Sequence, residues 1–379
     1  MKMNIPITKP DFGDEEKELI ARVLDSAWVT QGPRVAEFEE QFAAYVGARH
    51  AVATTSCTTA LHAALAVSGI GRGDEVIVPS LSFIATANAV VHAGAAPVFV
   101  DIDPETCNMR VDRIEAAITG RTKAIMPVHQ MGLPAEIDGI RQIAVKYNIL
   151  IIEDAACAIG SAYRGRRIGG HGNMACFSLH PRKIITTGEG GIITTDDSEL
   201  ASKLRRFRHH GMSVSDVERH SSEKVLVETY NEIGYNYRMT DIQAAIGIAQ
   251  LGRLPGILEK RRQIAEFYNR LLPEIPHLRV PCFPQHLYHN YQSYWIEIRG
   301  SSPVSRDTLM QKLLEKGIAT RRGIMAIHLE PCYRNPGISP LPDTERITAH
   351  TLLVPLYPSM SSVEQSFVVE SISECLSHG

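Results

Sequence analysis

The chain has 379 residues, of which 44% are hydrophobic and 21% charged, and its formal net charge of −3 excludes the basic excess typical of nucleic-acid-binding proteins. The seven cysteines are odd in number and form no CxxC pair, which argues against a zinc site or a disulfide framework and predicts reduced thiols. The first ten residues do not resemble a signal peptide and no apolar run could span a membrane, so we expect a cytoplasmic protein.

Two helices are predicted near the N-terminus, at residues 14–26 and 34–46. The second carries apolar side chains at helical spacing, which indicates a face turned toward a core. Between them, residues 27–33 form a Gly-Pro loop that contains Trp28 and Thr30. This loop is either a plain connection between two helices or a segment that faces a substrate.

From residue 50 onward, predicted strands alternate with predicted helices. The strands are expected at 50–54, 75–78, 97–100, 123–128 and 149–152, and the helices at 58–68, 83–93, 111–118 and 135–147. Such alternation predicts an α/β fold with a mostly parallel sheet and helices on both faces. Ligands in such folds bind beyond the carboxyl ends of the strands. The loops expected there are residues 55–59, 79–83, 101–103, 129–132 and 154–157.

Residues 55–59 open a predicted helix with small, hydroxyl-bearing side chains. Free backbone amides and the helix dipole at such an end favour an anion, for example a phosphate group. The same residues would also serve as an ordinary N-cap, so the anion site is one of two interpretations. Phe83, which opens the next helix, could stack on a flat ring or be a core aromatic side chain.

Residues 175–195 have the pattern of a strand, a tight polar turn, Lys183, a glycine-rich turn and a second strand. Gly188, Gly190 and Gly191 let the backbone bend sharply or approach a ligand closely. A lysine held between two strand ends is expected to be partly desolvated, which lowers its pKa and exposes a neutral amine nucleophile. The alternative is a surface lysine in a β-hairpin loop.

The run at residues 149–154 is apolar and ends in two carboxylates. This pattern is typical of a buried parallel strand with acids at its carboxyl end. Enzymes that use pyridoxal phosphate (PLP) combine a lysine that carries the cofactor with an acid on the nitrogen of the cofactor ring. We therefore take Lys183 and Asp154 as candidate catalytic residues.

The C-terminal third of the chain has a different pattern. Residues 213–229 are polar without periodicity and predict an exposed excursion, after which helices are expected at 240–251 and 255–272. Beyond them we expect a strand at 294–298 and helices at 305–316 and 363–375. The prediction is a large α/β domain at residues 1–252 and a smaller α+β domain at residues 253–379. Adjacent histidines 209 and 210 close a helix without metal-ligand spacing, so no metal is expected.

Three segments, EDAACAIGS, CFSLHPRKIITTGEGG and GYNYRMTDIQAAIG, resemble the DegT/DnrJ/EryC1/StrS family of PLP-dependent sugar aminotransferases. The resemblance extends from about Ile5 to about Leu376. It implies a fold-type-I PLP transferase, with a mostly parallel mixed sheet flanked by helices and a smaller α+β C-terminal domain. It also implies PLP as the cofactor.

The resemblance assigns roles to individual residues. Lys183 would carry PLP and move a proton during the reaction, Asp154 would hold the proton on the ring nitrogen, and Phe83 would cover one ring face. Asn236 matches a residue that reaches the phosphate from the other subunit, which implies a homodimer with shared active sites. The residues implied around the cofactor are Cys57, Thr58, Thr59, Phe83, Asp154, Cys157, Ser178, Lys183 and Asn236.

Two positions depart from the family pattern. Many members carry glutamine near the ring 3-hydroxyl where this chain has Cys157, a weak hydrogen-bond donor. Many have glycine in the phosphate turn where this chain has Cys57. The first departure puts in doubt the polar contact to the ring oxygen but not the lysine chemistry.

The substrates of the family are nucleotide-linked keto-deoxy sugars, and sometimes cyclitols. The run HPRKIITTGEGG is more similar to members that aminate C4 than to those that aminate C3, and we expect glutamate as the donor. Candidate substrate contacts are Thr30, His180 and His328. Trp28, Arg321 and Arg322 are also expected around the opening of the site, which we call the rim. The alternatives are a cyclitol or 3-keto sugar aminotransferase, another fold-type-I PLP activity, or a non-catalytic regulatory protein of the same fold.

Overall fold

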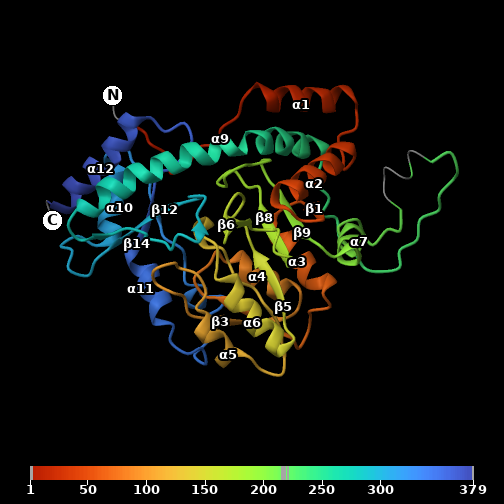
Figure 1. The fold of residues 1–379 in the computed structure, drawn as a ribbon, viewed down its shortest axis with the longest axis horizontal. Coiled ribbons are helices and arrows are strands. Elements are labelled where there is room, and N and C mark those ends of the chain that lie inside the picture. The colour runs from red at the N-terminus through yellow and green to blue at the C-terminus, as the bar shows by residue number, and fades with distance from the viewer. Residues whose placement is uncertain (1–2, 215–218, 220–221, 378–379) are drawn as a thin grey trace.

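The computed structural model describes residues 3–214, 219 and 222–377. Its centre is a seven-stranded sheet in the order β1-β9-β8-β5-β4-β2-β3 (Figure 1). Strand β9 is antiparallel to both of its neighbours, and all other pairs are parallel, which confirms the predicted mixed sheet. The strands are β1 (His50–Thr54), β2 (Glu75–Pro79), β3 (Ala96–Val100), β4 (Thr122–Ile125), β5 (Leu150–Asp154), β8 (Met174–Ser178) and β9 (Gly191–Thr195).

Helices cover both faces of this sheet because successive residues of the buried strands point to opposite sides. On one face, Ile152 and Cys176 pack with α3 (Cys57–Val67), α4 (Ala85–His92) and α7 (Ser198–Phe207). Their strand neighbours Ile151 and Phe177 lie on the other face. The helices there are α2 (Pro33–Val46), α5 (Ile114–Ala117) and α6 (Ile137–Tyr147). Short 3-10 turns are η1 (Val111–Arg113), η2 (Gln130–Gly132), η3 (Leu272–Glu274) and η4 (Ile327–Leu329).

One long helix, α9 (Asp241–Leu271), runs across the top of the molecule in Figure 1 and carries α1 (Asp14–Asp25) on its outer side. The sequence predicted two helices here, and that prediction is wrong: the helix continues through Pro255. Proline removes one backbone hydrogen bond, but apolar side chains before and after it, Leu254 and Ile257, are buried in the same core and hold the helix together.

The second unit is a four-stranded antiparallel sheet in the order β10-β12-β14-β13. It has its own core, which the second half of α9 joins through side chains such as Ile264 and Tyr268. Its strands are β10 (Leu278–Arg279), β12 (Tyr294–Ile298), β13 (Arg321–Arg322) and β14 (Thr351–Val354). Its helices are α10 (Arg306–Glu315), α11 (Pro342–His350) and α12 (Ser362–Ser377).

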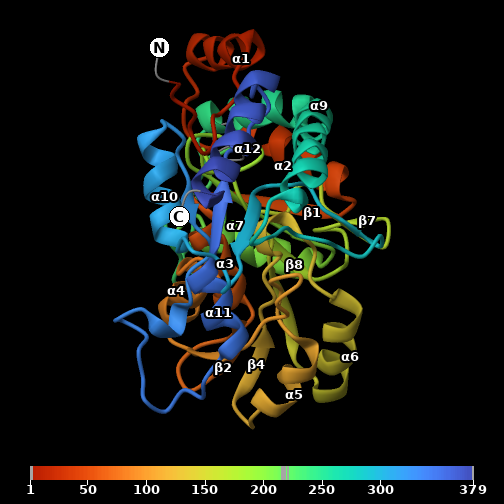
Figure 2. The ribbon, with the colours of Figure 1, turned by 90° about the vertical axis from the view of Figure 1, so that its left-hand side faces the viewer.

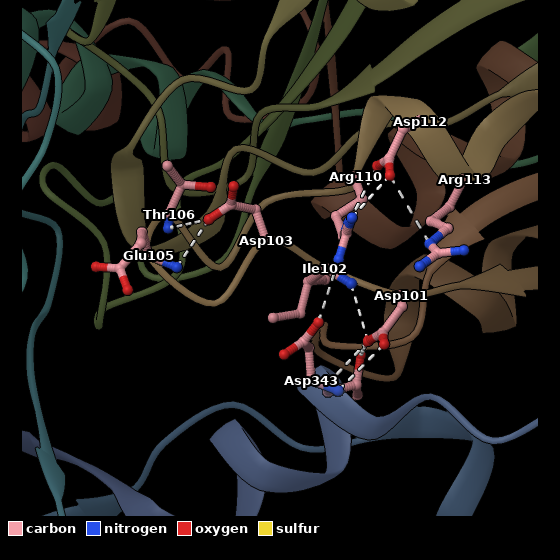
Figure 3. Close-up of polar contacts among 10 residues, drawn as sticks. Asp101, Ile102, Asp103, Glu105, Thr106, Arg110, Asp112, Arg113 and Asp343 are labelled. Atoms are coloured by element: carbon pink, nitrogen blue, oxygen red, sulfur yellow. Dashed lines mark hydrogen bonds and ion pairs between the residues drawn. The ribbon is translucent and has the colours of Figure 1, made fainter.

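A carboxylate of the large sheet holds α11 in place (Figure 3). Asp101, at the end of β3, accepts hydrogen bonds from the backbone amides of Asp343 and Thr344 at 3.1 and 2.8 Å and from the Thr344 hydroxyl at 2.7 Å. These amides belong to the first turn of α11, where a helix leaves its donors unpaired. Loop 101–103, expected at a ligand site, therefore serves as a cap between the two units, and Asp103 accepts hydrogen bonds within its own turn.

A small third sheet links the two units. Strand β11 (Leu287–Tyr288) pairs with β6 (Ala162–Tyr163), which also pairs with β7 (Arg166–Arg167). Near the N-terminus, Ile5 pairs with Ile318 of the small unit, whose helices α10, α11 and α12 face the viewer in Figure 2. Among the described residues, no helix is long and apolar enough to cross a membrane.

Residues 222–235, which lie between α7 and α9 and which we call the arm, reach away from the body of the molecule at the right of Figure 1. The arm exposes a series of apolar side chains. Val225, Val227 and Ile233 are 92%, 80% and 88% exposed, and Tyr230 is more than half exposed. Side chains of this kind are costly to leave in water, so the arm has the character of a contact surface.

Candidate active site

Lys183 lies in the turn that joins β8 to β9, at the edge where the parallel strands end. Its backbone amide donates to the carbonyl of His180 at 2.8 Å, which closes a tight turn around Pro181. The return to β9 depends on Gly191, because a Cβ there would collide with the backbone of Ser56 at the start of α3. The glycine run therefore brings the lysine turn and the first turn of α3 into direct contact.

Asp154 ends the neighbouring strand β5 and is buried. Its carboxylate accepts hydrogen bonds from the Thr86 hydroxyl at 2.7 Å and from the amide of Ala156 at 3.1 Å. Burial raises the pKa of Asp154, and these hydrogen bonds together with the charge of Lys183 lower it by less. A carboxyl group in this state gains most from a cation placed beside it, such as a protonated ring nitrogen.

The Lys183 amine lies 3.1 Å from the Sγ of Cys157, and the lysine is half-buried. Burial lowers the pKa of Lys183, but the interactions of the amine with Cys157, to which it is hydrogen-bonded, and with the Asp154 carboxyl raise the pKa by more. The expectation of a lowered lysine pKa is therefore wrong, because these neighbours outweigh desolvation. The structure places Lys183, Cys157, Cys57 and Asp154 close together.

The first turn of α3 combines the two interpretations of residues 55–59. Ser56 is the N-cap, and the hydroxyl of Thr59 donates to the Ser56 carbonyl at 2.8 Å and accepts from the Ser56 amide at 3.0 Å. Thr59 thus completes the cap, whereas the Thr58 hydroxyl makes no hydrogen bond within the described part of the chain. Thr58 and the free amides at the start of α3 are the groups left for an anion.

Ser178 and Cys57 border the same turn. Ser178 ends β8 opposite Gly191, the glycine that contacts the α3 turn. Cys57 is buried, and its thiol donates to the carbonyl of Cys176 at 3.4 Å. Burial raises the pKa of Cys57 well above its usual value, so this residue is a small apolar group in the turn.

Phe83 precedes α4 and is 65% exposed, so it is not the core aromatic that the alternative interpretation allowed. Its loop runs beside the small unit, where Leu81 pairs with Ala326. The carbonyl of Phe83 accepts a hydrogen bond from the amide of Thr86 at 3.1 Å, and the Thr86 hydroxyl contacts Asp154. The exposed ring of Phe83 is therefore available for stacking close to the site.

His328, predicted as a substrate contact, is buried, and both of its ring nitrogens have partners. Nδ1 lies 2.6 Å from the Ser80 hydroxyl and Nε2 lies 3.4 Å from the Glu345 carboxylate. The structure thus gives His328 a part in joining the two units. At the rim, Arg321 and Arg322 are exposed, and Arg322 pairs with Glu330 at 3.2 Å.

Thr30 and His180 belong to two segments, the first loop and the lysine turn, that both contact the start of α9. The carbonyl of Thr30 accepts from the amide of Asp241 at 3.1 Å, and its side chain is exposed. Gln243, in the same first turn of α9, donates to the carbonyl of Glu189 in the glycine turn at 2.8 Å. The start of α9 therefore brings the first loop next to the lysine turn. His180 is half-buried, and its Nδ1 accepts from the amide of Arg182 at 3.2 Å.

Asn236 follows the arm and is exposed. It pairs with His209 through its backbone, and the next residue, Tyr237, accepts a hydrogen bond from the amide of Thr55 at 3.0 Å. The predicted partner-subunit ligand is thus anchored at the base of the arm beside the α3 turn, with its side chain free to face outward.

Several buried polar residues near the site were not predicted. His129 is completely buried, with Nε2 2.9 Å from Glu153 and Nδ1 accepting from the amide of Ala135 at 3.0 Å. Its backbone amide also donates to the carbonyl of Asp154 at 3.1 Å. The available signal was the position of His129 at a strand end. Thr86, in the helix that Phe83 opens, carried no comparable signal.

The groups gathered here fit PLP on chemical grounds. An amine stands beside a buried carboxyl, a free hydroxyl and free amides stand at a helix N-terminus, and an exposed aromatic ring lies nearby. These match the aldehyde, ring nitrogen, phosphate and ring face of the cofactor. When bound, PLP supplies an electron-accepting ring and an aldehyde that exchanges amino groups.

Comparison with known proteins gives the same result. Residues 10–373 match the model of the DegT/DnrJ/EryC1/StrS aminotransferase family. The chain is 39% identical over 375 residues to the spore coat polysaccharide biosynthesis protein SpsC of Bacillus subtilis (strain 168), covering 98% of this chain and 96% of SpsC.

Two solved structures share this fold over almost their whole lengths. The PLP form of the putative sugar aminotransferase Spr1654 from Streptococcus pneumoniae is 29% identical, with a TM-score of 0.92 and 99% of each chain covered. The structure of DesI in the presence of its TDP-sugar product is 32% identical, with a TM-score of 0.90, and covers 100% of this chain and 94% of DesI.

Proposed function

Because the chain belongs to the DegT/DnrJ/EryC1/StrS aminotransferase family and is a PLP-dependent sugar aminotransferase, we propose that it transfers an amino group from glutamate to C4 of a nucleotide-linked 4-keto-6-deoxy sugar. The observation that carries this proposal is the Lys183 amine beside the buried carboxyl of Asp154. The similarity of the chain to SpsC, a spore coat polysaccharide biosynthesis protein, supports a role of the product in polysaccharide synthesis.

Each residue would act through the group that the structure leaves available. The Lys183 amine, held by its turn, would carry the cofactor and afterwards move the proton between substrate carbon and cofactor carbon. Asp154 would keep its negative charge next to the ring nitrogen and stabilise the positive charge there. Phe83 would cover one ring face, while Thr58 and Ser178 would hold the phosphate.

The sugar assignment is supported by the rim and by the relatives. Thr30 and His180 offer a hydroxyl and an imidazole, which suit the hydroxyl groups of a sugar. DesI was solved with a TDP-sugar, which favours a nucleotide-linked substrate for this chain as well. The resemblance of residues 180–191 to family members that aminate C4 is the argument for that position.

We also propose that the active enzyme is a homodimer in which Asn236 serves the neighbouring site. The arm that precedes Asn236 exposes Val225, Val227 and Ile233, and a second copy of the chain would bury them. A two-fold axis would repeat such a contact in both directions, so each copy could give Asn236 to the other.

The test is an assay with purified protein, PLP, glutamate and a panel of nucleotide-linked sugars that carry the ketone at C4 or at C3. We expect amino-sugar formation, read by mass spectrometry, with the 4-keto-6-deoxy substrates, and no product with Lys183→Ala. Turnover of the 3-keto sugars alone would move the position to C3. Turnover only of cyclitol ketones or small 2-oxo acids would contradict the sugar assignment.

A further inference from the structure

The segment between β11 and β12, residues 289–293, passes from one core to the other. Leu287, just before it, is buried in the core of the large sheet, and Tyr294, just after it, in the core of the small unit. We call residues 289–293 the connector. Two of its side chains, Asn290 and Gln292, donate hydrogen bonds to the two cofactor turns, which contain Cys157 and Lys183.

Asn290 of the connector is buried, and all of its amide group is used. Its Nδ2 donates to the carbonyls of Cys157 at 2.7 Å and Ile159 at 2.8 Å. Its Oδ1 accepts from the amide of Gln292 at 2.8 Å. The contact is so close that a Cβ at Gly132 would collide with Oδ1, so glycine is needed there. Asn290 therefore fixes the backbone that presents the Cys157 thiol.

Gln292 reaches the other turn. It is 7% exposed, and its Nε2 donates to the carbonyl of Arg182, the residue before Lys183, at 2.6 Å. Its Oε1 has no hydrogen-bond partner among the described residues. A buried acceptor without a donor costs free energy, which an apolar side chain of the same size would avoid. The one hydrogen bond to the lysine turn is therefore what this glutamine contributes.

The connector is itself fixed to α9. Arg261 is buried, and its Nε and Nη2 donate to the carbonyls of Tyr291 at 3.0 Å and Gln292 at 2.7 Å. Burial lowers the pKa of Arg261 to about 9. A cation placed in the interior to bind two backbone carbonyls holds that backbone in a single position.

Within the described residues, one hydrogen bond joins the Cys157 turn directly to the Lys183 turn, from Nζ to Sγ. We propose that Asn290 and Gln292 are positioning residues of the cofactor site: they fix the two turns to one another through the connector, so that the Lys183 amine keeps its place when the cofactor carbonyl approaches. This role does not depend on which sugar is the substrate.

The decisive variant is Gln292→Met, which keeps the side-chain length and removes both the hydrogen bond to Arg182 and the unpaired oxygen. We expect a thermal midpoint within about 2 °C of wild type, because the lost hydrogen bond and the removed unpaired acceptor offset one another. We expect PLP to bind about ten-fold more weakly, measured by equilibrium titration of cofactor absorbance, and Lys183 to be trapped by borohydride correspondingly more slowly.

The matched control is Asn269→Ala. Asn269 contacts the hydroxyls of Tyr291 and Tyr294 but neither cofactor turn, so PLP affinity should not change. A second variant, Asn290→Ala, should weaken PLP binding more than Gln292→Met because it frees two carbonyls. Wild-type PLP affinity in Gln292→Met, or an equal loss in the Asn269→Ala control, would overturn the proposal. Neither readout uses the sugar, so failure here is distinct from failure of the substrate assignment.

Discussion

The two sides of the site are built differently. On the large-sheet side, Asp154, Lys183 and Thr58 come from strand ends and a helix start, and each has a reactive or binding group turned to the site. On the small-unit side, His328 and Gln292 form hydrogen bonds to other residues of the protein. We infer that the large-sheet side performs the chemistry and that the small-unit side keeps the residues of the site in position.

Two carboxylates of the large sheet, Asp154 in the site and Asp101 at the contact with the small unit, show the contrast between chemistry and support most clearly. Burial makes the charged form of Asp154 costly, so its pKa is raised. Asp101 instead pairs with the unpaired donors of α11 and contributes to stability. The same substitution at these two positions should therefore have opposite consequences.

The largest expected effect is that of Asp154→Asn. Loss of the charge beside the ring nitrogen should slow the transamination half-reaction by about 3–4 kcal/mol of barrier, or about two to three orders of magnitude, while PLP still binds. Because the buried charge is removed, the thermal midpoint should hardly fall. The measurement is single-turnover loss of the amine form of the cofactor. A near wild-type rate would make Asp154 a structural residue only.

The next prediction concerns Asn236, which follows the arm and is exposed on the large-sheet side. Lys183→Ala and Asn236→Ala proteins should each be inactive, and mixing them should restore about a quarter of wild-type activity, since half the dimers are hybrids with one intact site of two. If hybrids form, as shown by tagged purification, but stay inactive, the site is built within one chain.

At the contact between the two units, Asp101→Asn should lower the free energy of unfolding by about 1–2 kcal/mol, because an amide accepts fewer of the hydrogen bonds from the first turn of α11. Denaturant titration measures this loss. The rate at saturating substrate should change far less than in Asp154→Asn. A variant as stable as wild type would show that α11 is held by its apolar contacts alone.

At pH 7 the smallest effect is expected from His289, at the start of the connector. Its Nδ1 accepts from the amide of Tyr291 at 2.7 Å, and burial followed by the charges of Arg262 and Arg261 lowers its pKa to about 3. Below about pH 6.5, His289 binds a proton in the unfolded chain but not in the native chain. The free energy of unfolding should therefore fall as the pH falls toward 3, by about 1.4 kcal/mol per pH unit at most.

His289→Asn keeps an acceptor for the Tyr291 amide and removes the titrating ring. Its stability should therefore depend less on pH between 6 and 4 than that of wild type, as measured by urea unfolding at each pH. At pH 7 the histidine is neutral in both states and makes no such contribution. Equal slopes in the two proteins would show that His289 is protonated in the native chain.

Those parts of the fold that depend on neighbouring residues in the chain could be predicted from the sequence. The alternation of apolar runs predicted the parallel sheet, and strands such as 50–54 and 294–298 lie where they were expected. Lys183 and Asp154 could be proposed as catalytic residues because the pattern of a lysine turn and an acidic strand end lies within a few residues of each. The periodicity of side chains is a property of the chain, so it survives in any fold.

Other features of the protein depend on contacts between residues far apart in the chain, and these could not be predicted from the sequence. The continuous helix through Pro255, the raised pKa of Lys183 and the burial of His328 all come from groups that no local pattern reveals. Gln292 reaches the lysine turn across 110 residues, through one hydrogen bond. Such contacts are set by packing of whole elements, because a buried polar group must find whichever partner the fold brings to it.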